Sequence, residues 1–269
     1  MVNLVQEDLD LQKIADSGQC FRLTQEAPGR FRLLAKGRAL RLRALSTGAQ
    51  LECTPEEYDA LWRDYFDMDT DYAAFRRAVP AEDGYLTAAA DCGRGIRILR
   101  QDPWETLVTF LLSQRKNISA IRRAVETLCA RYGDPVPGGG AAFPAPARLA
   151  ALEEADLRSC ALGYRAPYVL AAARMAADGT LDFSALSALD DDALLSALQA
   201  VPGVGPKVAG CAALFGFHRL AGFPRDVWIN RVIDREYGGE FPLERVAPFA
   251  GVAQQYLFYY ARTQAGRVR

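Results

Sequence analysis

Two residues with the chemistry of a covalent catalyst stand nineteen positions apart: Lys207 in VPGVGPKVAGC and Asp226 in FPRDVWINRV. Lys207 follows a Gly-Val-Gly-Pro turn at the start of an apolar helical pattern. The positive end of a helix dipole and partial burial both favour the neutral form of a lysine amine. A neutral amine is a nucleophile that can attack a carbon such as C1′ of a deoxynucleotide and form a Schiff base. The alternative is a charged lysine that binds a phosphate.

Asp226 is the candidate for the carboxylate that such an attack requires. A carboxylate can stabilise positive charge that develops on a sugar and can help to move protons. Asp226 also directly precedes an apolar helical pattern from Val227 to Ile233, which predicts an N-cap. The two roles are compatible, so we keep both.

The composition narrows the chemistry further. The chain has 269 residues, half of them hydrophobic, and a net charge of -1, as in an ordinary globular protein. A single histidine, His218, argues against His-based triads and His metal sites. Six scattered cysteines form no CxxC pair, which argues against zinc or iron-sulfur sites. We expect no metal and no organic cofactor.

No apolar run approaches the ~20 residues that a membrane span requires. The first residues, MVNLVQEDLD, lack the pattern of a signal peptide. We therefore expect no membrane partner and a cytoplasmic location, associated with the nucleoid if the source is bacterial.

The chain has two regions with different patterns of apolar residues, one typical of strands and one typical of helices. Alternating apolar and basic residues between Phe31 and Cys53 predict a small antiparallel meander, and a helix starts at Thr54-Pro55-Glu56-Glu57. Later segments read as helices. One of these helices begins at a capping box at Asp102. The Pro- and Gly-rich residues 135–147 predict a surface loop between helices. Further helices are expected at 118–132, 150–160, 165–177, 190–200 and 246–263.

The residues around Lys207 form a predicted helix-hairpin-helix. Residues 194–200 are helical in pattern, VPGVG cannot continue a helix, and Pro206 is suited to begin the next one. The backbone N-H groups of Gly203, Val204 and Gly205 are expected to point outward at the start of that helix. The helix dipole favours an anion there, and a DNA phosphate fits that description.

Four separated segments resemble the 8-oxoguanine branch of the helix-hairpin-helix (HhH-GPD) DNA glycosylases. The hairpin and aspartate signature is LQAVPGVGPKVAGC followed by RDVWINRV. SGQCFR, LGYRAPYVLAAAR and GVAQQYLFYYAR resemble, in order, an N-terminal segment, an internal helix and the last core helix of that branch. The resemblance extends over residues 16–263. Endonuclease III relatives have the same lysine and aspartate but hold an iron-sulfur cluster through four late cysteines, which this chain lacks.

The resemblance implies a fold of α+β class, mainly α. An N-terminal antiparallel β-sheet subdomain with trailing helices would occupy residues 1–85, and a helical glycosylase core that contains the helix-hairpin-helix would occupy 86–269. The family also implies a bifunctional DNA glycosylase/AP lyase of base excision repair. Its partner would be double-stranded DNA containing 8-oxoguanine, and the enzyme would act as a monomer.

The resemblance assigns roles to individual residues. Lys207 would be the nucleophile that displaces the damaged base, and Asp226 the catalytic carboxylate. The flipped base would lie in a pocket, as enzymes that react with a base require. The backbone carbonyl of Gly18 would accept the N7-H that distinguishes 8-oxoguanine from guanine. Gln254 would read the Watson-Crick edge, and Phe258 and Cys211 would sandwich the ring.

This chain departs from the family pattern at three positions. The Asn-rich turn that fills the gap left by the flipped base is here Gln114-Arg115-Lys116-Asn117, so Arg115 stands where an asparagine contacts the orphaned cytosine. Arg115 and Asn117 are the DNA-binding candidates of this turn, and the opposite-base preference stays open. Trp228 replaces a histidine that helps to hold phosphate, and Leu23 replaces a common tryptophan.

Two alternatives accompany this interpretation. One is a glycosylase of the same family with a different damaged base. The other is a noncatalytic DNA-binding protein that uses the hairpin for phosphate alone. The net charge of -1 weakens nonspecific DNA binding. Arg94, Arg97 and Arg100 recur at helical spacing, so we count them as possible local charge for DNA.

Overall fold

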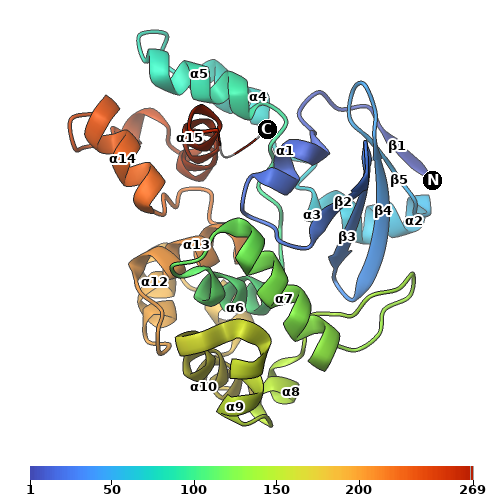
Figure 1. The fold of residues 1–269 in the computed structure, drawn as a ribbon. Coiled ribbons are helices and arrows are strands. Elements are labelled where there is room, and N and C mark those ends of the chain that lie inside the picture. The colour runs from blue at the N-terminus through green and yellow to red at the C-terminus, as the bar shows by residue number, and fades with distance from the viewer. Residues whose placement is uncertain (267, 269) are drawn as a thin grey trace.

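The computed structural model describes residues 1–266 and 268. A five-stranded antiparallel sheet lies on one side of the molecule and helices form the rest (Figure 1). The sheet order is β1-β5-β4-β3-β2. Its strands are β1 (Val2–Leu4), β2 (Leu23–Ala27), β3 (Arg30–Ala35), β4 (Arg38–Ala44) and β5 (Ala49–Leu51). The α+β, mainly helical class is thereby confirmed.

The predicted meander is present but smaller than the sheet. Leu40 and Leu42 are buried and Arg41 is exposed, as the alternation in β4 predicts. The sheet also includes β1 and β2, which lie outside the predicted residues 31–53. Neither added strand shows alternation, because β1 is three residues long and β2 carries a register shift between Gln25 and Ala27.

The apolar face of the sheet forms a first hydrophobic core with short helices. Trp62, Tyr65 and Phe66 are buried in it, and the Trp62 indole N-H donates to Glu57 at 3.0 Å. The helical elements up to residue 78 are α1 (Leu11–Asp16), α2 (Pro55–Glu57), the π-helical turn η1 (Tyr58–Trp62), α3 (Arg63–Tyr65) and α4 (Tyr72–Ala78).

A second, larger core lies among the helices that follow, and α4 also packs into it. These helices are α5 (Gly84–Gly93), α6 (Pro103–Ser113), α7 (Ile118–Tyr132), α8 (Pro146–Ala150), α9 (Glu154–Leu157), η2 (Arg158–Leu162), η3 (Gly163–Arg165), α10 (Ala166–Ala177), α11 (Phe183–Ser187), α12 (Asp191–Gln199), α13 (Pro206–Gly216), α14 (Val227–Glu236), η4 (Leu243–Arg245) and α15 (Ala250–Gln264). The predicted division of the chain at residue 85 stays a prediction.

Two predicted helices differ from the structure. The helix expected at 150–160 is divided into α8, α9 and η2, because residues 151–153 leave the helix and Ala161 has a positive φ of 60°. The last helix begins at Ala250 rather than near Val246, since the short turn η4 and Pro248 precede it.

The Pro- and Gly-rich loop lies on the surface between α7 and α8, as predicted, and one side of it packs against the sheet. Gly138 lies beside Ala39 of β4, and the Arg32 side chain of β3 donates to the Gly139 carbonyl. In Figure 1 the loop after α7 runs toward β3 and β4.

A buried arginine joins the two cores. Arg97 is 0% exposed and donates to backbone carbonyls of Asp8, Phe66, Asp67 and Thr70. The segment from Arg94 to Arg100 is not helical, so these arginines do not share a helix face. Arg97 is buried and cannot supply charge to DNA, so that prediction is wrong for Arg97. Its helical spacing was coincidental.

Candidate active site

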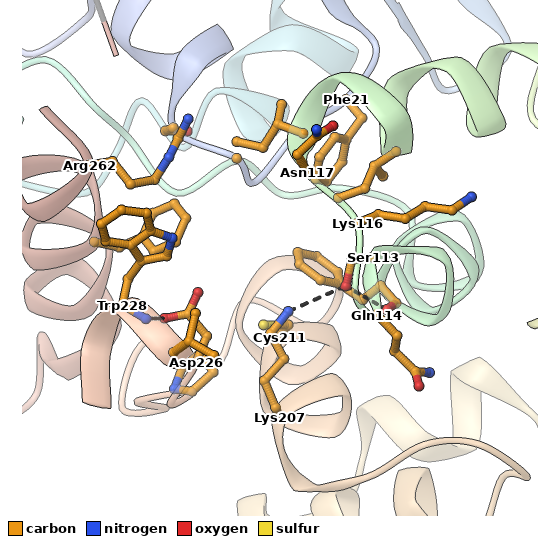
Figure 2. A pocket seen from close by; sticks show the side chains of 18 of the residues that line it. Phe21, Ser113, Gln114, Lys116, Asn117, Lys207, Cys211, Asp226, Trp228 and Arg262 are labelled. Carbon is orange, nitrogen blue, oxygen red and sulfur yellow. Dashed lines mark hydrogen bonds between the residues drawn. The ribbon is translucent and has the colours of Figure 1, made fainter. Parts of the chain in front are cut away.

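One cavity of about 1040 Å³ gathers most of the predicted site residues (Figure 2). Its walls come from the segment before β2, the end of α6, the start of α7 and the helices α13, α14 and α15. The predicted site residues that line it are Gly18, Arg115, Asn117, Lys207, Cys211, Asp226, Gln254 and Phe258. The hairpin residues Gly203, Val204 and Gly205 are not among the lining residues.

Lys207 lies in the first turn of α13, where Pro206 begins the helix as predicted. Its Nζ donates to the Ser113 hydroxyl at 3.4 Å and lies 4.9 Å from the centre of the Phe110 ring. The lysine side chain is therefore half-buried against α6 instead of extending into water. Ser113 is itself held, because its hydroxyl donates to the Phe110 carbonyl at 2.7 Å.

Asp226 caps α14, as its position before the apolar pattern predicts. One carboxylate oxygen, Oδ1, accepts the backbone N-H groups of Trp228 and Ile229, both at 2.9 Å. The capping bonds fix the orientation of the carboxylate. The second oxygen, Oδ2, receives no hydrogen bond from any residue that the structure describes. Asp226 therefore keeps one oxygen for the cavity while the other holds the helix.

Lys207 and Asp226 face each other across the cavity (Figure 2). Cys211, one turn after Lys207 on the same helix face, lies near both. Burial raises the pKa of the Cys211 thiol above its ordinary value, while Lys207 opposes that rise and Asp226 adds to it. The thiol is thus a neutral, apolar wall of the cavity near neutral pH.

Gly18 supplies a stretch of backbone to the wall of the cavity. It has a φ of +78°, a conformation that glycine adopts easily and other residues rarely do. A Cβ on Gly18 would lie 3.1 Å from Ile118 Cδ1 and 3.3 Å from Phe258 Cε1. The chain therefore passes close to both side chains, and only glycine fits without displacement.

Gln254 and Phe258 project from one face of α15, four residues apart. Gln254 is 5% exposed, and its Oε1 is buried without a hydrogen-bond partner among the described residues. A buried amide oxygen without a partner is costly unless a ligand or water satisfies it. Since this amide lines the cavity, it is suited to bind a polar ligand there.

The turn between α6 and α7 is held from behind. Arg165 donates to the Gln114 carbonyl, with Nε at 2.9 Å, and Gln114 Nε2 donates to the Gly203 carbonyl at 3.1 Å. Arg115 is exposed with a φ of 52°. Asn117 caps α7, since its Oδ1 accepts the Ala120 N-H at 2.9 Å. The capping role of Asn117 was not anticipated.

The hairpin between α12 and α13 differs in one detail from expectation. The Val204 N-H donates to the Val201 carbonyl at 3.0 Å, so it closes the turn and does not point outward. The Val204 side chain is buried. Gly203 has a φ of +83° and packs against the ring of Tyr168. Of the three predicted N-H donors, those of Gly203 and Gly205 remain for an anion.

Several lining residues were missed at the level of sequence. Phe110 and Phe215 stack with ring centres 5.5 Å apart, and Phe21 meets Phe110 edge to face at 6.1 Å. Phe110 and Phe215 read as ordinary core residues in the sequence, because α6 and α13 are largely apolar, whereas Phe21 lies in the bend before β2. The other lining residues that were missed as site residues include Ser113, Arg122, Gln255 and Arg262.

Within residues 1–266 and 268, no group of three or more His, Cys, Asp or Glu side chains could hold a metal ion. None of the described helices is long and apolar enough to cross a membrane.

Residues 1–107 match the family of 8-oxoguanine DNA glycosylase N-terminal domains, and residues 108–241 match the HhH-GPD superfamily of base excision DNA repair proteins. A probable N-glycosylase/DNA lyase of Methanothermobacter thermautotrophicus is 31% identical over 229 residues, which cover 73% of this chain and 72% of that protein.

Two solved structures resemble the whole chain. The Clostridium acetobutylicum 8-oxoguanine glycosylase/lyase, in complex with dsDNA containing cytosine opposite to 8-oxoG, has a TM-score of 0.90 at 30% identity and covers 96% of this chain and 93% of its own. MBOgg1 in complex with a low affinity DNA ligand has a TM-score of 0.92 at 32% identity, with coverage of 97% and 94%.

Proposed function

The chain belongs to the 8-oxoguanine DNA glycosylase family of the HhH-GPD superfamily, and we propose that Lys207 and Asp226 carry out the glycosylase and lyase reaction on its DNA substrate. It is an N-glycosylase/DNA lyase of base excision repair. One observation carries the assignment of the residues: an amine faces a carboxylate across one cavity, and no described residue binds the second oxygen of that carboxylate (Figure 2).

The first step is base release. The uncharged Nζ of Lys207 attacks C1′ of the flipped nucleotide, and the bond between C1′ and the base breaks. The electron pair of that bond leaves with the base, which takes up a proton. Asp226 Oδ2 stabilises the positive charge that develops on the sugar, because the two backbone N-H groups on Oδ1 already fix the carboxylate in place.

The second step cleaves the strand. The sugar ring opens as Lys207 and C1′ form a Schiff base, which acidifies the protons at C2′. Loss of one C2′ proton to a base then expels the 3′ phosphate through cleavage of the bond between C3′ and oxygen. Water hydrolyses the Schiff base and returns Lys207 as a free amine.

Recognition of the lesion rests on the other walls of the cavity. The Gly18 carbonyl would accept the N7-H of 8-oxoguanine, and Gln254 would bind the Watson-Crick edge with its buried, unpartnered Oε1. Phe258 and Cys211 would cover the two faces of the ring. The unpartnered oxygen supports this proposal, because a base edge would satisfy it.

Duplex DNA containing 8-oxoguanine is the proposed partner, and the C. acetobutylicum relative has been solved with such a duplex. Arg115 and Asn117 would contact DNA at the gap left by the flipped base, and the N-H groups of Gly203 and Gly205 would bind a phosphate. That the protein acts as a monomer stays a prediction.

Borohydride trapping tests the nucleophile. A duplex with 8-oxoguanine opposite cytosine should give a covalent adduct with the wild type, because borohydride reduces the Schiff base to a stable amine. Lys207→Gln should give none, and its strand cleavage should fall by at least about a thousandfold. Lys36→Gln is the matched control, since Lys36 is exposed in the turn between β3 and β4. An adduct with Lys207→Gln would refute the assignment of Lys207 as the nucleophile, whereas the absence of an adduct with the wild type would favour the noncatalytic alternative.

A panel of damaged and opposite bases tests the substrate. Cleavage should be fastest at 8-oxoguanine. Equal rates at an alkylated purine would support the alternative of a different lesion.

A further inference from the structure

Three consecutive backbone carbonyls before Gly18 are held by side chains from two distant helices. Arg122 of α7 donates to the Ala15 carbonyl. From α15, Arg262 Nη1 donates to the Asp16 carbonyl and Gln255 Nε2 donates to the Ser17 carbonyl, both at 2.8 Å. We call these three donor residues the carbonyl clamp. All three clamp residues line the cavity. The segment is thus bound to α7 and α15 at each residue that leads into Gly18.

The hydrogen bond between Gln255 and Ser17 of the carbonyl clamp lies in the protein interior. Gln255 is 2% exposed and Ser17 is 0% exposed, so neither could exchange this hydrogen bond for water. Loss of the donor would leave a buried carbonyl without a partner, which is costly. The Ser17 hydroxyl is also engaged, because it donates to the Ile14 carbonyl at 2.7 Å.

The residue after Gly18 is held as firmly. Gln19 is 1% exposed, its Nε2 donates to the Arg97 carbonyl at 2.9 Å, and its Oε1 accepts the Leu99 N-H at 2.9 Å. Gly18 therefore lies between two immobilised neighbours. Glycine has the widest range of backbone rotation, so the direction of its carbonyl depends on those neighbours.

The Gly18 carbonyl itself is free for a ligand. Among the hydrogen bonds of the described residues, none ends on it, whereas the three carbonyls before it are each occupied. The pattern is what a recognition carbonyl requires, because no described residue uses its lone pairs and its position is set by hydrogen bonds to the three carbonyls that precede it.

We propose that the carbonyl clamp of Arg122, Gln255 and Arg262 positions the Gly18 carbonyl and thereby sets the discrimination between 8-oxoguanine and guanine. The inference rests on the proposed function. 8-Oxoguanine presents an N-H donor at N7, whereas guanine presents an acceptor there. A fixed carbonyl attracts the first and repels the second, so specificity depends on how rigidly the carbonyl is held.

An abasic site separates this role from a merely structural one. It has no base to be read, yet its strand is cleaved through the same lysine and carboxylate. A displaced Gly18 carbonyl should therefore impair excision of 8-oxoguanine and spare cleavage at a preformed abasic site in the same duplex.

Gln255→Leu is the principal test, because it removes the donor without changing charge. Excision of 8-oxoguanine under single-turnover conditions should fall about tenfold, the scale of one buried carbonyl left without its donor. Cleavage at the abasic site should change by less than about twofold. In a Lys207→Gln background, the ratio of affinities for 8-oxoguanine and guanine duplexes should fall toward one.

The arginines of the clamp need a control for charge. Arg122→Met should reduce excision more than abasic cleavage, whereas Arg123→Met, which removes the same charge from the exposed neighbouring position, should affect the two reactions equally. Arg262→Lys, which keeps a donor, should retain more discrimination than Arg262→Met.

A parallel loss of both reactions in Gln255→Leu and Arg122→Met would overturn the proposal, because it would show a structural role only. Unchanged excision would overturn it as well. If the wild type itself formed no adduct with abasic DNA, the proposed function would fail instead, so the two failures are distinguishable.

Discussion

Asp226 combines two roles that a single substitution can separate. Asparagine caps helices about as well as aspartate, so Asp226→Asn should keep the capping bonds and lower the free energy of unfolding by less than about 0.5 kcal/mol. It removes the negative charge, and base excision should fall at least about a hundredfold. Thermal unfolding and single-turnover excision measure the two effects.

The control for Asp226 is another cap. Asp226→Ala should lose both properties, with about 1 kcal/mol of stability, whereas Asp190→Ala at the start of α12 should lose stability alone. Full activity in Asp226→Asn would contradict the catalytic assignment.

Gly18 can be compared with a second glycine of similar backbone conformation. Gly29 has a φ of +67° and open space around its α-carbon, whereas Gly18 has a φ of +78° and two close side chains. Both alanine variants should cost about 1 kcal/mol for the left-handed backbone. Only Gly18→Ala should also lose excision of 8-oxoguanine, since the methyl group would displace Ile118 or Phe258. Equal excision by the two variants would show that the site tolerates a shift at Gly18.

That Lys207 and Asp226 each stand at the start of a helix could be predicted at the residue scale, but their surroundings in the cavity could not. Lys207 and the cap at Asp226 each belong to a short local motif, and local patterns survive in a single sequence. The carbonyl clamp joins Asp16 to Arg262, 246 positions away, through a backbone atom that every residue possesses. No residue type marks such a carbonyl in the sequence.

The helix-hairpin-helix is the element whose geometry matters most, and its two glycines make different demands. A Cβ on Gly203 would collide with the Tyr168 ring at a positive φ, whereas Gly205 has an extended backbone and open space. Gly203→Ala should destabilise the protein by about 2 kcal/mol or more, and Gly205→Ala by less than about 0.5 kcal/mol.

The same pair distinguishes stability from DNA binding. Gly205→Ala should still weaken affinity for duplex DNA, because its methyl group would stand beside the N-H proposed to bind phosphate. Thermal unfolding and DNA titrations at two salt concentrations would measure both effects. Equal stability of the two variants would contradict the packing described for Gly203.

The helix starts that carry an N-cap, at Thr54 and Asp102, were predicted because capping is local, but the positions of the two glutamate side chains that follow them were not. Asp102 accepts the Glu105 N-H at 2.9 Å, which confirms the start of α6. The Glu105 side chain instead lies near Arg22, and Glu57 accepts the Trp62 indole N-H. Whether a side chain is buried depends on the distant element that covers it. The capping sequence alone therefore does not predict where these two glutamate side chains lie.

At the scale of the whole molecule, Glu105 lies where the segment before β2 meets α6 and α7. Burial raises the pKa of the Glu105 carboxyl to about 7, although Arg22 opposes the rise. A carboxyl with a raised pKa in the folded state binds its proton more tightly when folded. Its stabilising effect is complete below its ordinary pKa of 4.5 and is lost as the pH rises through about 7.

Glu105→Gln should therefore be more stable than the wild type at pH 8, by about 1 to 2 kcal/mol, since a neutral amide is not desolvated as a charge. The difference should shrink toward pH 5. Glu154→Gln, in an exposed pair with Arg158, should show no such dependence. Chemical unfolding between pH 5 and pH 8 gives the comparison, and a constant difference would refute the assignment to Glu105.

The assembly of the two cores was the hardest feature to predict. Arg97 shares its spacing with Arg94 and Arg100, yet it alone is wholly buried. The charges of the three arginines are the same, so the sequence alone does not distinguish the buried one from the other two. Only the meeting of carbonyls from residues 8, 66, 67 and 70 gives Arg97 its interior position.

The bond between Arg262 and the carbonyl of Asp16 has a consequence for the protein during its synthesis. A nascent chain that has just exposed Lys207 and Asp226 on the ribosome still lacks α15, and with it Gln254 and Phe258. Contacts between the two ends of a chain form late. The cavity that holds Lys207 and Asp226 is thus completed only after α15 has been made.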